Sequence, residues 1–308
     1  MLAVTVALLA GAGCSAGTAA RPSGRSSSTS GTQQAGGAPA VPPTAAQPCG
    51  TGARPPARYD HVVWIVLENH SYSEEIGTDQ APYTTALAGR CGSATNFHAE
   101  ARPSLPNYVA MTSGGTQGIT DDGPPADNAV AVDNIFAQLG DRWRALQESM
   151  PQACSRDDAG QYAVKHNPAV YYRNVEAACA RQDVALTTPP DLSAAFTFIT
   201  PDLCHDTHDC PIPTGDAWLA ATLPLILDSP QYATGRTAVF LTWDEPADDD
   251  AAGNIPTLVI APSVPAGTMV ADRLDHYSML RTTQEMLGLP RLLGAAVGAP
   301  SMRPAFRL

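Results

Sequence analysis

Four stretches of the chain are continuous runs of apolar residues, rich in β-branched and aromatic types, and each ends abruptly in polar residues. Such runs are typical of strands buried on both faces, as in the parallel centre of an α/β sheet. The predicted strands span residues 61–69, 195–200, 237–245 and 257–262.

Segments with a helical pattern lie between or beside these runs. They span residues 82–90, 131–149, 215–229 and 277–288. Strands that alternate with helices predict an α/β layered sandwich.

The first part of the chain differs in composition from the rest. Residues 1–14 have the uncharged apolar run of an export signal and end at Cys14 in a context similar to a lipobox, so we expect export and a lipid anchor on Cys14. Residues 15–57 are rich in Ser, Gly and Pro and predict a flexible tether. Residues 58–308 are predicted to form one domain.

Six cysteines remain when Cys14 is set aside. An even number in an exported chain predicts disulfides, and six cysteines allow fifteen pairings. Order along the sequence favours three of these pairings: Cys49–Cys91, Cys154–Cys179 and Cys204–Cys210. Zinc ligation is the weaker interpretation, because no pair has C-x₂-C spacing.

The chain is acidic, with 30 Asp and Glu against 18 Lys and Arg and a formal net charge of −12. This balance argues against nucleic acid and against anionic lipid surfaces as general partners. An anionic substrate would therefore need a local cation, and a bound metal ion is the obvious source.

Carboxylates and an amide follow two of the predicted strands. Glu68 and Asn69 end the first run, and Asp244 and Glu245 end the third. The carboxyl ends of strands are where sites form in open α/β sheets, and oxygen ligands suit hard or borderline cations. The alternatives are a polar loop at Glu68-Asn69 and a solvent-facing turn at Asp244-Glu245.

Ser104 lies between two prolines in PSLPNY, residues 103–108, which predicts a turn-like or extended backbone around it. No G-x-S-x-G motif surrounds this serine, so activation by a metal fits better than an α/β-hydrolase triad. Asn107 is placed to donate its amide to a developing negative charge. An ordinary tight loop is the alternative.

Histidines stand in two other segments with possible chemistry. His205 and His208 lie in LCHDTHDCP, in a loop that a Cys204–Cys210 disulfide would make rigid. His276 precedes a predicted helix, where it is either functional or simply packed beside an N-terminal cap.

Seven ordered blocks, between about residues 59 and 290, together resemble one protein family. They are VVWIVLENHSY, ARPSLPNYVAMTSG, GITDD, WRALQESMP, PDLCHDTHDC with GDAWL, VFLTWDE and DHYSMLRTTQEMLGLP. The family is the bacterial phosphoesterases that include acid phosphatases and phosphatidylcholine-type phospholipases C, within the alkaline-phosphatase-like superfamily. The chain looks closer to the small acid-phosphatase branch.

The resemblance implies a three-layer α/β sandwich with a mixed central sheet and helices on both faces. It implies a metal-dependent phosphomonoesterase that acts on small phosphate esters through a phosphoserine at Ser104. One divalent cation, Ca²⁺, Mg²⁺, Mn²⁺ or Zn²⁺, is expected. The implied metal ligands are Glu68, Asn69, Ser104, Asp244 and Glu245.

The histidine roles are also carried over from the family motifs. Asn107 and His208 are expected to assist catalysis, and His98, His205 and His276 are candidates for the phosphate pocket. The competing functions are a phospholipase C or phosphodiesterase acting on lipid headgroups and a non-catalytic cell-surface lipoprotein with the same fold.

Overall fold

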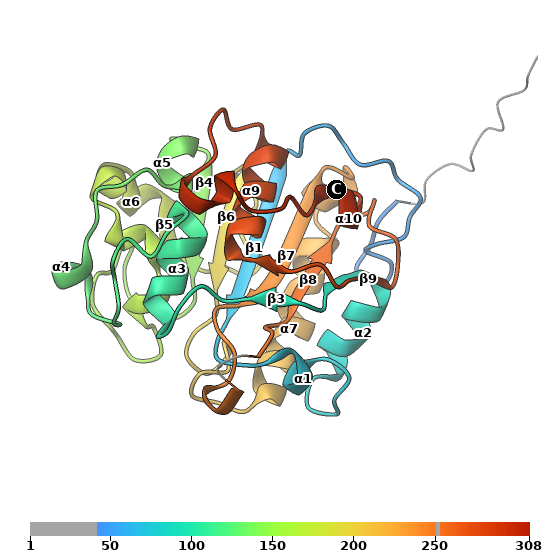
Figure 1. Ribbon diagram of the computed structural model, residues 1–308, viewed down its shortest axis with the longest axis horizontal. Coiled ribbons are helices and arrows are strands. Elements are labelled where there is room, and N and C mark those ends of the chain that lie inside the picture. The colour runs from blue at the N-terminus through green and yellow to red at the C-terminus, as the bar shows by residue number, and fades with distance from the viewer. Residues whose placement is uncertain (1–41, 251–252) are drawn as a thin grey trace, which may run out of the picture. The chain divides into compact units, whose positions relative to one another are not determined.

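An eight-stranded mixed sheet forms the centre of the structure. The computed structural model in Figure 1 describes residues 42–250 and 253–308. The strands follow the order β5-β4-β6-β1-β7-β8-β2-β9 across the sheet. Their bounds are β1 His61–Leu67, β2 Gly92–Ala94, β4 Trp143–Gln147, β5 Asp183–Ala185, β6 Phe196–Thr200, β7 Thr237–Trp243, β8 Thr257–Ile260 and β9 Thr268–Val270.

The longest strands occupy the middle of the sheet. β1 pairs in parallel with β6 on one side and with β7 on the other, while β8 runs antiparallel to β7. All of β7 is buried, as is β1 beyond its first residue. The four predicted strands therefore exist, and the mixed sheet is confirmed.

Helices cover both faces of this sheet. The α-helices are α1 Tyr72–Glu75, α2 Pro82–Arg90, α3 Ser104–Ser113, α4 Pro125–Asn128, α5 Ile135–Leu139, α6 Glu176–Gln182, α7 Ile212–Leu227, α8 Pro230–Ala233, α9 His276–Leu287 and α10 Arg303–Phe306. In Figure 1, α3 and α9 lie in front of the sheet and α7 lies behind it.

Side-chain contacts from β1 show the two faces directly. Trp64 donates a 3.0 Å hydrogen bond from Nε1 to Thr283 of α9. Leu67 lies on the opposite face, because successive side chains alternate along a strand. There it meets Gly215 of α7, where a Cβ would come within 3.6 Å of Leu67 and 2.4 Å of Thr207. Gly215 therefore permits the close approach of α7 to the sheet.

One predicted helix is largely wrong. Residues 131–149 contain only the five-residue α5, and the strand β4 follows it. Gly140 ends α5 with a φ of 62°, a backbone conformation that favours glycine. β4 then pairs with β5 and β6, and this pairing with distant residues outweighs the local helical pattern.

The three predicted disulfides are confirmed: Cys49–Cys91, Cys154–Cys179 and Cys204–Cys210. The first attaches residues before β1 to the domain, and Tyr232 also donates a hydrogen bond to the carbonyl of Pro48. Residues 42–57, which composition assigned to the tether, thus contact the globular part of the chain. The predicted export signal and Cys14 lie outside the described residues.

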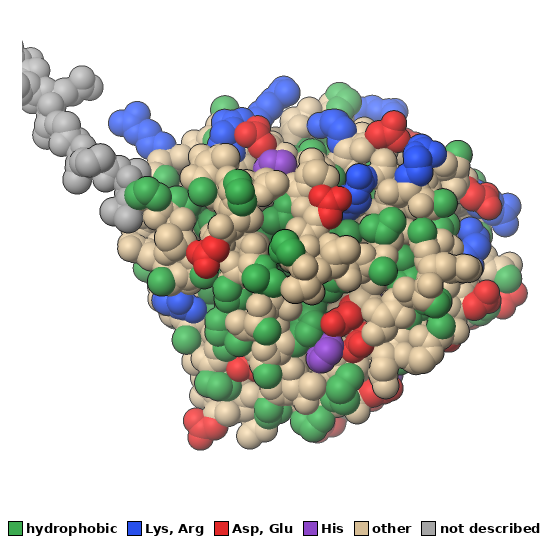
Figure 2. Space-filling model, turned by 180° about the vertical axis from the view of Figure 1, so that it is seen from behind, with side chains coloured by type: hydrophobic (Ala, Val, Ile, Leu, Met, Phe, Trp, Pro, Cys, Tyr) green, Lys and Arg blue, Asp and Glu red, His purple; other side chains and the backbone are tan. Residues whose placement is uncertain are grey.

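Across residues 42–250 and 253–308, no helix has the length and apolar character needed to cross a membrane. Figure 2 shows the face opposite that of Figure 1, where acidic and basic side chains are interspersed with apolar ones.

Candidate active site

The polar residues that follow β1 and β7 meet at one edge of the sheet. The two strands are parallel neighbours in register from His61 with Thr237 to Leu67 with Trp243. Their carboxyl ends are therefore adjacent, and the backbone N–H of Asn69 donates a 3.1 Å hydrogen bond to Oδ1 of Asp244. The sheet register thus brings Glu68-Asn69 and Asp244-Glu245 together.

Ser104 is the first residue of α3, so the backbone around it is helical rather than the extended or turn-like shape predicted. Pro103 is the extended N-cap, and Pro106 lies in the first turn, where a helix does not need the missing N–H. The hydroxyl of Ser104 is buried and donates a 2.8 Å hydrogen bond to Oε2 of Glu68. The two prolines therefore start a helix that presents the serine to the carboxylate cluster.

Asn107 holds the segment before α3 in place. Its Oδ1 accepts hydrogen bonds from the backbone N–H groups of Glu100 and Ala101, at 3.0 and 2.9 Å. Its Nδ2 lies 3.5 Å from Oε2 of Glu245. Asn107 thus links the serine helix to the carboxylates that follow β7.

His166, a residue that the sequence did not single out, lies at the centre of this cluster. Its imidazole is 1% exposed, with Nε2 3.3 Å from Oε1 of Glu68 and Nδ1 3.0 Å from Oδ2 of Asp206. Its ring stacks on Tyr108 at a centroid distance of 5.3 Å, and the Tyr108 hydroxyl donates to Glu68. Both oxygens of Glu68 are thereby engaged, one by Ser104 and the other by Tyr108 and His166.

The charges in this cluster are strongly coupled. Burial alone would lower the pKa of His166, but the negative charge of Glu68 raises that pKa to about 10. Burial alone would raise the pKa of Glu68, yet the His166 cation lowers it to about 2. Glu68 and His166 therefore form a buried ion pair at neutral pH.

The carboxylates after β7 lack such compensation. Burial, together with the charges of Glu68 and Glu245, raises the pKa of Asp244 well above its usual range. Burial is also the main cause that raises the pKa of Glu245 to about 7, against the opposing effect of Arg102. A cation at this edge of the sheet would keep both groups ionised.

Two buried oxygens in the cluster support a cation site. Oδ1 of Asn69 and Oδ2 of Asp244 are buried and have no hydrogen-bond partner among residues 42–250 and 253–308. The charges of Glu68 and Glu245 act on Asp244, and Glu68 accepts the hydrogen bond from Ser104, so the potential ligand atoms are all oxygens. Unpartnered buried oxygens are costly without a cation, so the residues present fit a hard or borderline divalent metal.

His208 approaches the cluster from the disulfide-closed loop. Its ring centroid lies 5.8 Å from that of His166. Lys165 donates to Nε2 of His208 at 3.2 Å and pairs with Asp122 at 3.0 Å. His208 Nδ1 donates in turn to Asp209 at 2.7 Å. The structure thus places His208 beside the carboxylate cluster, where Nε2 of its ring accepts a hydrogen bond from the Lys165 ammonium.

His205, from the same loop, makes a different set of contacts. Its Nδ1 lies 2.9 Å from Glu148 and 3.4 Å from Asp202, and its ring stacks on Trp218. These three potential ligand atoms lie within 4.8 Å of one another. The cluster is already linked internally, because Asp202 accepts from the backbone N–H groups of Cys204 and His205.

The two remaining predicted histidines contact neither His166 nor Glu68 among the hydrogen bonds of the described residues. His276 is fully buried, and its Nε2 lies 2.8 Å from the backbone carbonyl of Asp244. Burial lowers the pKa of His276 to about 4, so this neutral ring donates to the carbonyl and supports the Asp244 backbone. His98 is partly exposed, bonds to Asn96 at 2.7 Å and lines a pocket described below.

Sequence reasoning missed His166, Lys165, Tyr108 and Asp122. Tyr108 and Asp122 fall inside blocks that carried the family resemblance, but neither residue type has a distinctive spacing. Lys165 and His166 lie in irregular structure between β4 and α6, with a 3₁₀ turn at Val164–His166. The polar run KHN, between apolar residues, is the one sequence signal that could have found them.

Most of the chain matches one known protein family. Residues 77–290 match the Phosphoesterase family, which is more than half of the chain. The chain belongs to the phosphoesterase family. It is therefore a hydrolase of phosphate esters, and the resemblance seen in the sequence is confirmed.

Curated relatives of this phosphoesterase include phosphatases. A phosphatidylinositol-3-phosphatase of Mycobacterium tuberculosis is 34% identical over 249 residues, which cover 79% of this chain and 81% of that protein. An acid phosphatase of Aspergillus fumigatus is 28% identical, over 75% of this chain and 55% of its own length. The phosphoesterase thus spans little more than half of that fungal relative.

Solved structures show the same fold at low identity. A protein of the alkaline phosphatase superfamily from Vibrio parahaemolyticus aligns with a TM-score of 0.55 and 11% identity, over 81% of this chain and 72% of that one. A 2-O GAG sulfatase aligns with a TM-score of 0.57 and 10% identity, over 81% and 74%. The phosphoesterase therefore has an alkaline-phosphatase-like fold.

Proposed function

We propose that this phosphoesterase hydrolyses phosphate monoesters through a covalent phosphoserine at Ser104. The observation that supports this most directly is the 2.8 Å hydrogen bond from the Ser104 hydroxyl to Glu68, in a centre where carboxylates outnumber the cations. A serine at a helix start, beside a cluster that fits a metal, has both an activated oxygen and a site for an anionic phosphate. The names of the relatives, a phosphatidylinositol-3-phosphatase and an acid phosphatase, support a monoester substrate for this chain rather than the diester substrate of a phospholipase.

We further infer that one divalent cation is held by Glu68, Asn69, Ser104, Asp244 and Glu245. When bound, such a cation supplies positive charge that favours the ionised serine oxygen and the phosphate. Its oxygen-only donor set is compatible with Ca²⁺, Mg²⁺, Mn²⁺ or Zn²⁺.

The residues of the chain then have distinct tasks. The Ser104 proton points at Oε2 of Glu68, which accepts it along the observed hydrogen bond. The serine oxygen forms a bond to phosphorus while the bond from phosphorus to the alcohol oxygen breaks. Water then attacks the phosphoserine, which releases phosphate and restores the hydroxyl. Positioning and charge neutralisation account for most of the catalysis in phosphoryl transfer.

The departing alcohol oxygen takes up a proton, and we assign its delivery to the Lys165–His208 pair. Lys165 donates to Nε2 of His208 in the structure, so the ammonium carries the proton and His208 positions it. The alcohol oxygen takes this proton, and the proton that the attacking water gives up restores the ammonium. Asn107 positions the serine helix through its hydrogen bonds to the backbone of Glu100 and Ala101, and His98 borders the same region. His276 supports the Asp244 backbone, and His205 fixes the loop that carries His208.

The proposed setting of this activity is outside the cytoplasm. Three disulfides are typical of chains that fold in an oxidising compartment. We also propose that residues 1–14 direct export and that Cys14 carries a lipid anchor.

The test is a comparison of p-nitrophenyl phosphate with p-nitrophenyl phosphorylcholine and bis(p-nitrophenyl) phosphate. We expect the monoester to be the best substrate, with activity lost in EDTA and restored by one of the four divalent cations. Ser104→Ala should reduce kcat at least about 10³-fold and abolish the acid-stable phosphoprotein that is trapped on rapid quenching. Full activity in Ser104→Ala, or a preference for phosphorylcholine, would refute the proposal.

A further inference from the structure

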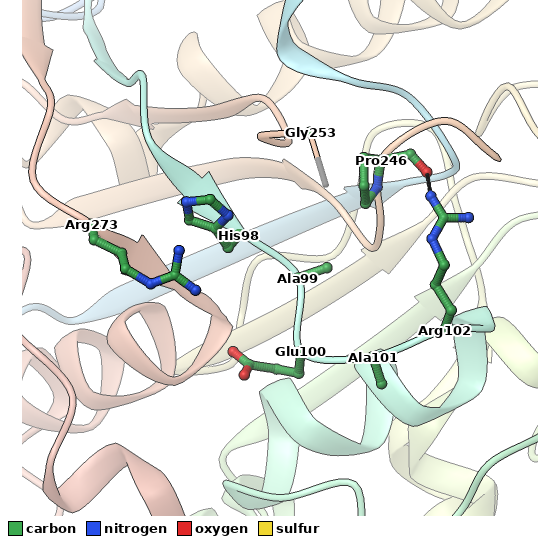
Figure 3. Close-up of a pocket in the computed structure, with 8 residues that line it drawn as sticks. All are labelled: His98, Ala99, Glu100, Ala101, Arg102, Pro246, Gly253 and Arg273. Carbon is green, nitrogen blue, oxygen red and sulfur yellow. Dashed lines mark hydrogen bonds between the residues drawn. The ribbon is translucent and has the colours of Figure 1, made fainter. Parts of the chain in front are cut away.

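A polar pocket of about 200 Å³ opens beside the catalytic centre. Its walls carry three basic side chains, His98, Arg102 and Arg273, together with the carboxyl group of Glu100. Figure 3 shows Arg102 and Arg273 at opposite ends of the pocket, with His98 and Glu100 nearer to Arg273.

The pocket shares a wall with the proposed metal site. Glu100 and Arg102 belong to the segment that leads into Ser104, and Asn107 binds the backbone N–H of Glu100. On the other side, Pro246 follows Glu245, and Arg102 Nη1 lies 4.0 Å from Oε1 of Glu245. A substrate whose phosphate sits at Ser104 therefore has this pocket directly beside its leaving group.

The two arginines of the pocket differ in whether acidic or carbonyl groups of the protein already bind their guanidinium groups. Arg102 pairs with Asp248 at 2.8 Å and donates to the carbonyls of Pro246 and Ala247, so it braces the loop after β7. Arg273 is exposed, and no hydrogen bond or ion pair holds its guanidinium within the described part of the chain. Arg273 therefore supplies the available positive charge.

The backbone fixes where Arg273 stands. Its neighbours Leu274 and Asp275 form β10, which pairs in parallel with β3, Phe97–His98, so that Leu274 lies opposite Phe97. Figure 3 shows the Arg273 guanidinium reaching toward the space between His98 and Glu100. Burial, and then the Arg273 charge, lower the pKa of His98, which agrees with this proximity.

Glu100 does not cancel this charge below neutral pH. Its burial and the charge of Asp275 raise its pKa to about 8. Its Oε1 is buried and unpartnered among the residues that the structure describes. The pocket thus combines an available guanidinium with a carboxyl group that is protonated, and so able to donate, over the acidic and neutral range.

We propose that this pocket binds a second anionic group of the substrate, through Arg273, while the scissile phosphate occupies the Ser104 centre. This inference rests on the proposed phosphomonoesterase function. It narrows the substrate class to phosphate monoesters that carry another phosphate, phosphodiester or carboxylate group. A soluble bisphosphate and a phosphorylated lipid headgroup share this chemistry.

The first experiment compares matched substrates on the wild-type enzyme. α,ω-Alkanediol bisphosphates of three, four and six carbons are set against the corresponding hydroxyalkyl monophosphates, so that only the second phosphate differs. We expect kcat/KM to favour the bisphosphate of best length about tenfold, as one charge-assisted contact would give. Arg273→Ala should remove this preference to within twofold, while kcat/KM for the monophosphate stays unchanged.

Two variants serve as controls. Arg273→Lys keeps the charge and should retain part of the preference. Arg181→Ala removes another exposed arginine, from α6, which packs on β5 at the far edge of the sheet. This variant should change kcat/KM for neither substrate. If Arg273→Ala lowers kcat/KM equally for the bisphosphate and the monophosphate, or lowers it for neither, the proposal is overturned.

A binding measurement separates this inference from the proposed function. Calorimetric titration of Ser104→Ala protein with the same pairs needs no turnover, and it should show tighter binding of the bisphosphate that Arg273→Ala abolishes. If the wild-type enzyme hydrolyses no monoester, the proposed function fails while this titration still decides the pocket. A last assay compares kcat/KM for soluble dibutanoyl phosphatidylinositol 3-phosphate with kcat/KM for its long-chain form in vesicles. A higher value for the soluble form indicates a soluble substrate, and a higher value for the vesicles indicates a lipid headgroup.

Discussion

The hydroxyl of Ser104 donates a 2.8 Å hydrogen bond to Oε2 of Glu68, across 36 positions of sequence. Glu68 is held by the end of the central strand β1, and Ser104 by the start of α3. The other oxygen of Glu68 contacts Tyr108 and His166. Glu68 thus contacts both the serine and the buried imidazole, and it is also a proposed metal ligand.

Replacing His166 by Asn should destabilise the protein and reduce activity. The substitution leaves Glu68 and Asp206 as buried carboxylates without the cation between them, and such a loss typically costs about 3–5 kcal/mol. Denaturant unfolding in EDTA measures this change. Asp206→Asn removes one carboxylate but keeps the ion pair of His166 with Glu68. This variant should therefore lose less of the free energy of unfolding than His166→Asn. Equal stability of wild type and His166→Asn would show that the imidazole is not the compensating charge.

Removal of divalent metal should lower the melting temperature as well as the activity. A ligand that binds only the folded state at 100 times its Kd contributes about 2.7 kcal/mol of stability. Asp244→Asn removes a buried negative charge, so in EDTA this variant should be at least as stable as wild type. It should also lose the rise in melting temperature that metal gives. If added metal stabilises both proteins equally, Asp244 is not a ligand.

Stability should fall as pH rises through the window set by Glu75. This side chain is 2% exposed, and burial together with Asp216 raises its pKa from 4.5 to about 8. Between these values the folded protein keeps a proton that the unfolded chain has lost, so stability declines by up to about 1.4 kcal/mol per pH unit.

Glu75→Gln should remove this part of the pH dependence. The variant is expected to melt higher than wild type at pH 8 to 9 and close to it at pH 5. Glu176→Gln, at an exposed position, is the matched control and should follow the wild-type curve. A wild-type slope retained in Glu75→Gln would assign the effect to other buried carboxyl groups.

Two disulfides should differ in what their removal costs. Cys154–Cys179 spans 25 residues and Cys204–Cys210 spans 6, so chain entropy predicts losses of about 3.5 and about 2.2 kcal/mol for the respective double serine variants. Activity should follow the reverse order, because the shorter loop positions His208 beside Lys165. Assays at a temperature where both variants remain folded measure the difference. A larger loss of activity on opening Cys154–Cys179 would contradict this role of the loop.

The elements predicted most reliably were those whose stability depends on local pattern. The strand that precedes Glu68 and the helix α2 were predicted with near-correct bounds. A buried strand has a continuous run of apolar residues, and a helix has a periodic pattern, and both are visible in the sequence. The β4 strand was missed, since Trp143–Gln147 becomes a strand only by pairing with β5 and β6. Short strands such as β2 and the edge strand β9 have too few residues to show a pattern.

The same division holds for the site. Glu68, Asn69, Asp244 and Glu245 could be predicted because carboxylates at strand ends are visible in sequence. His166 could not, because it lies in irregular structure and gains its chemistry from two carboxylates that are 98 and 40 residues away. Arg273 likewise looks like an ordinary surface residue until β10 pairs with β3.

The sequence by itself determined the strands that end in carboxylates, the serine between prolines, the cysteine pairs and the family. These depend on residue type and spacing, which a single chain displays directly. The tertiary structure alone decided which charges face one another: the ion pair of Glu68 with His166, the neutral His276 and the available Arg273 in its pocket. Charge interactions act across space and depend on burial, and neither distance nor burial is encoded in the spacing of residues along the chain.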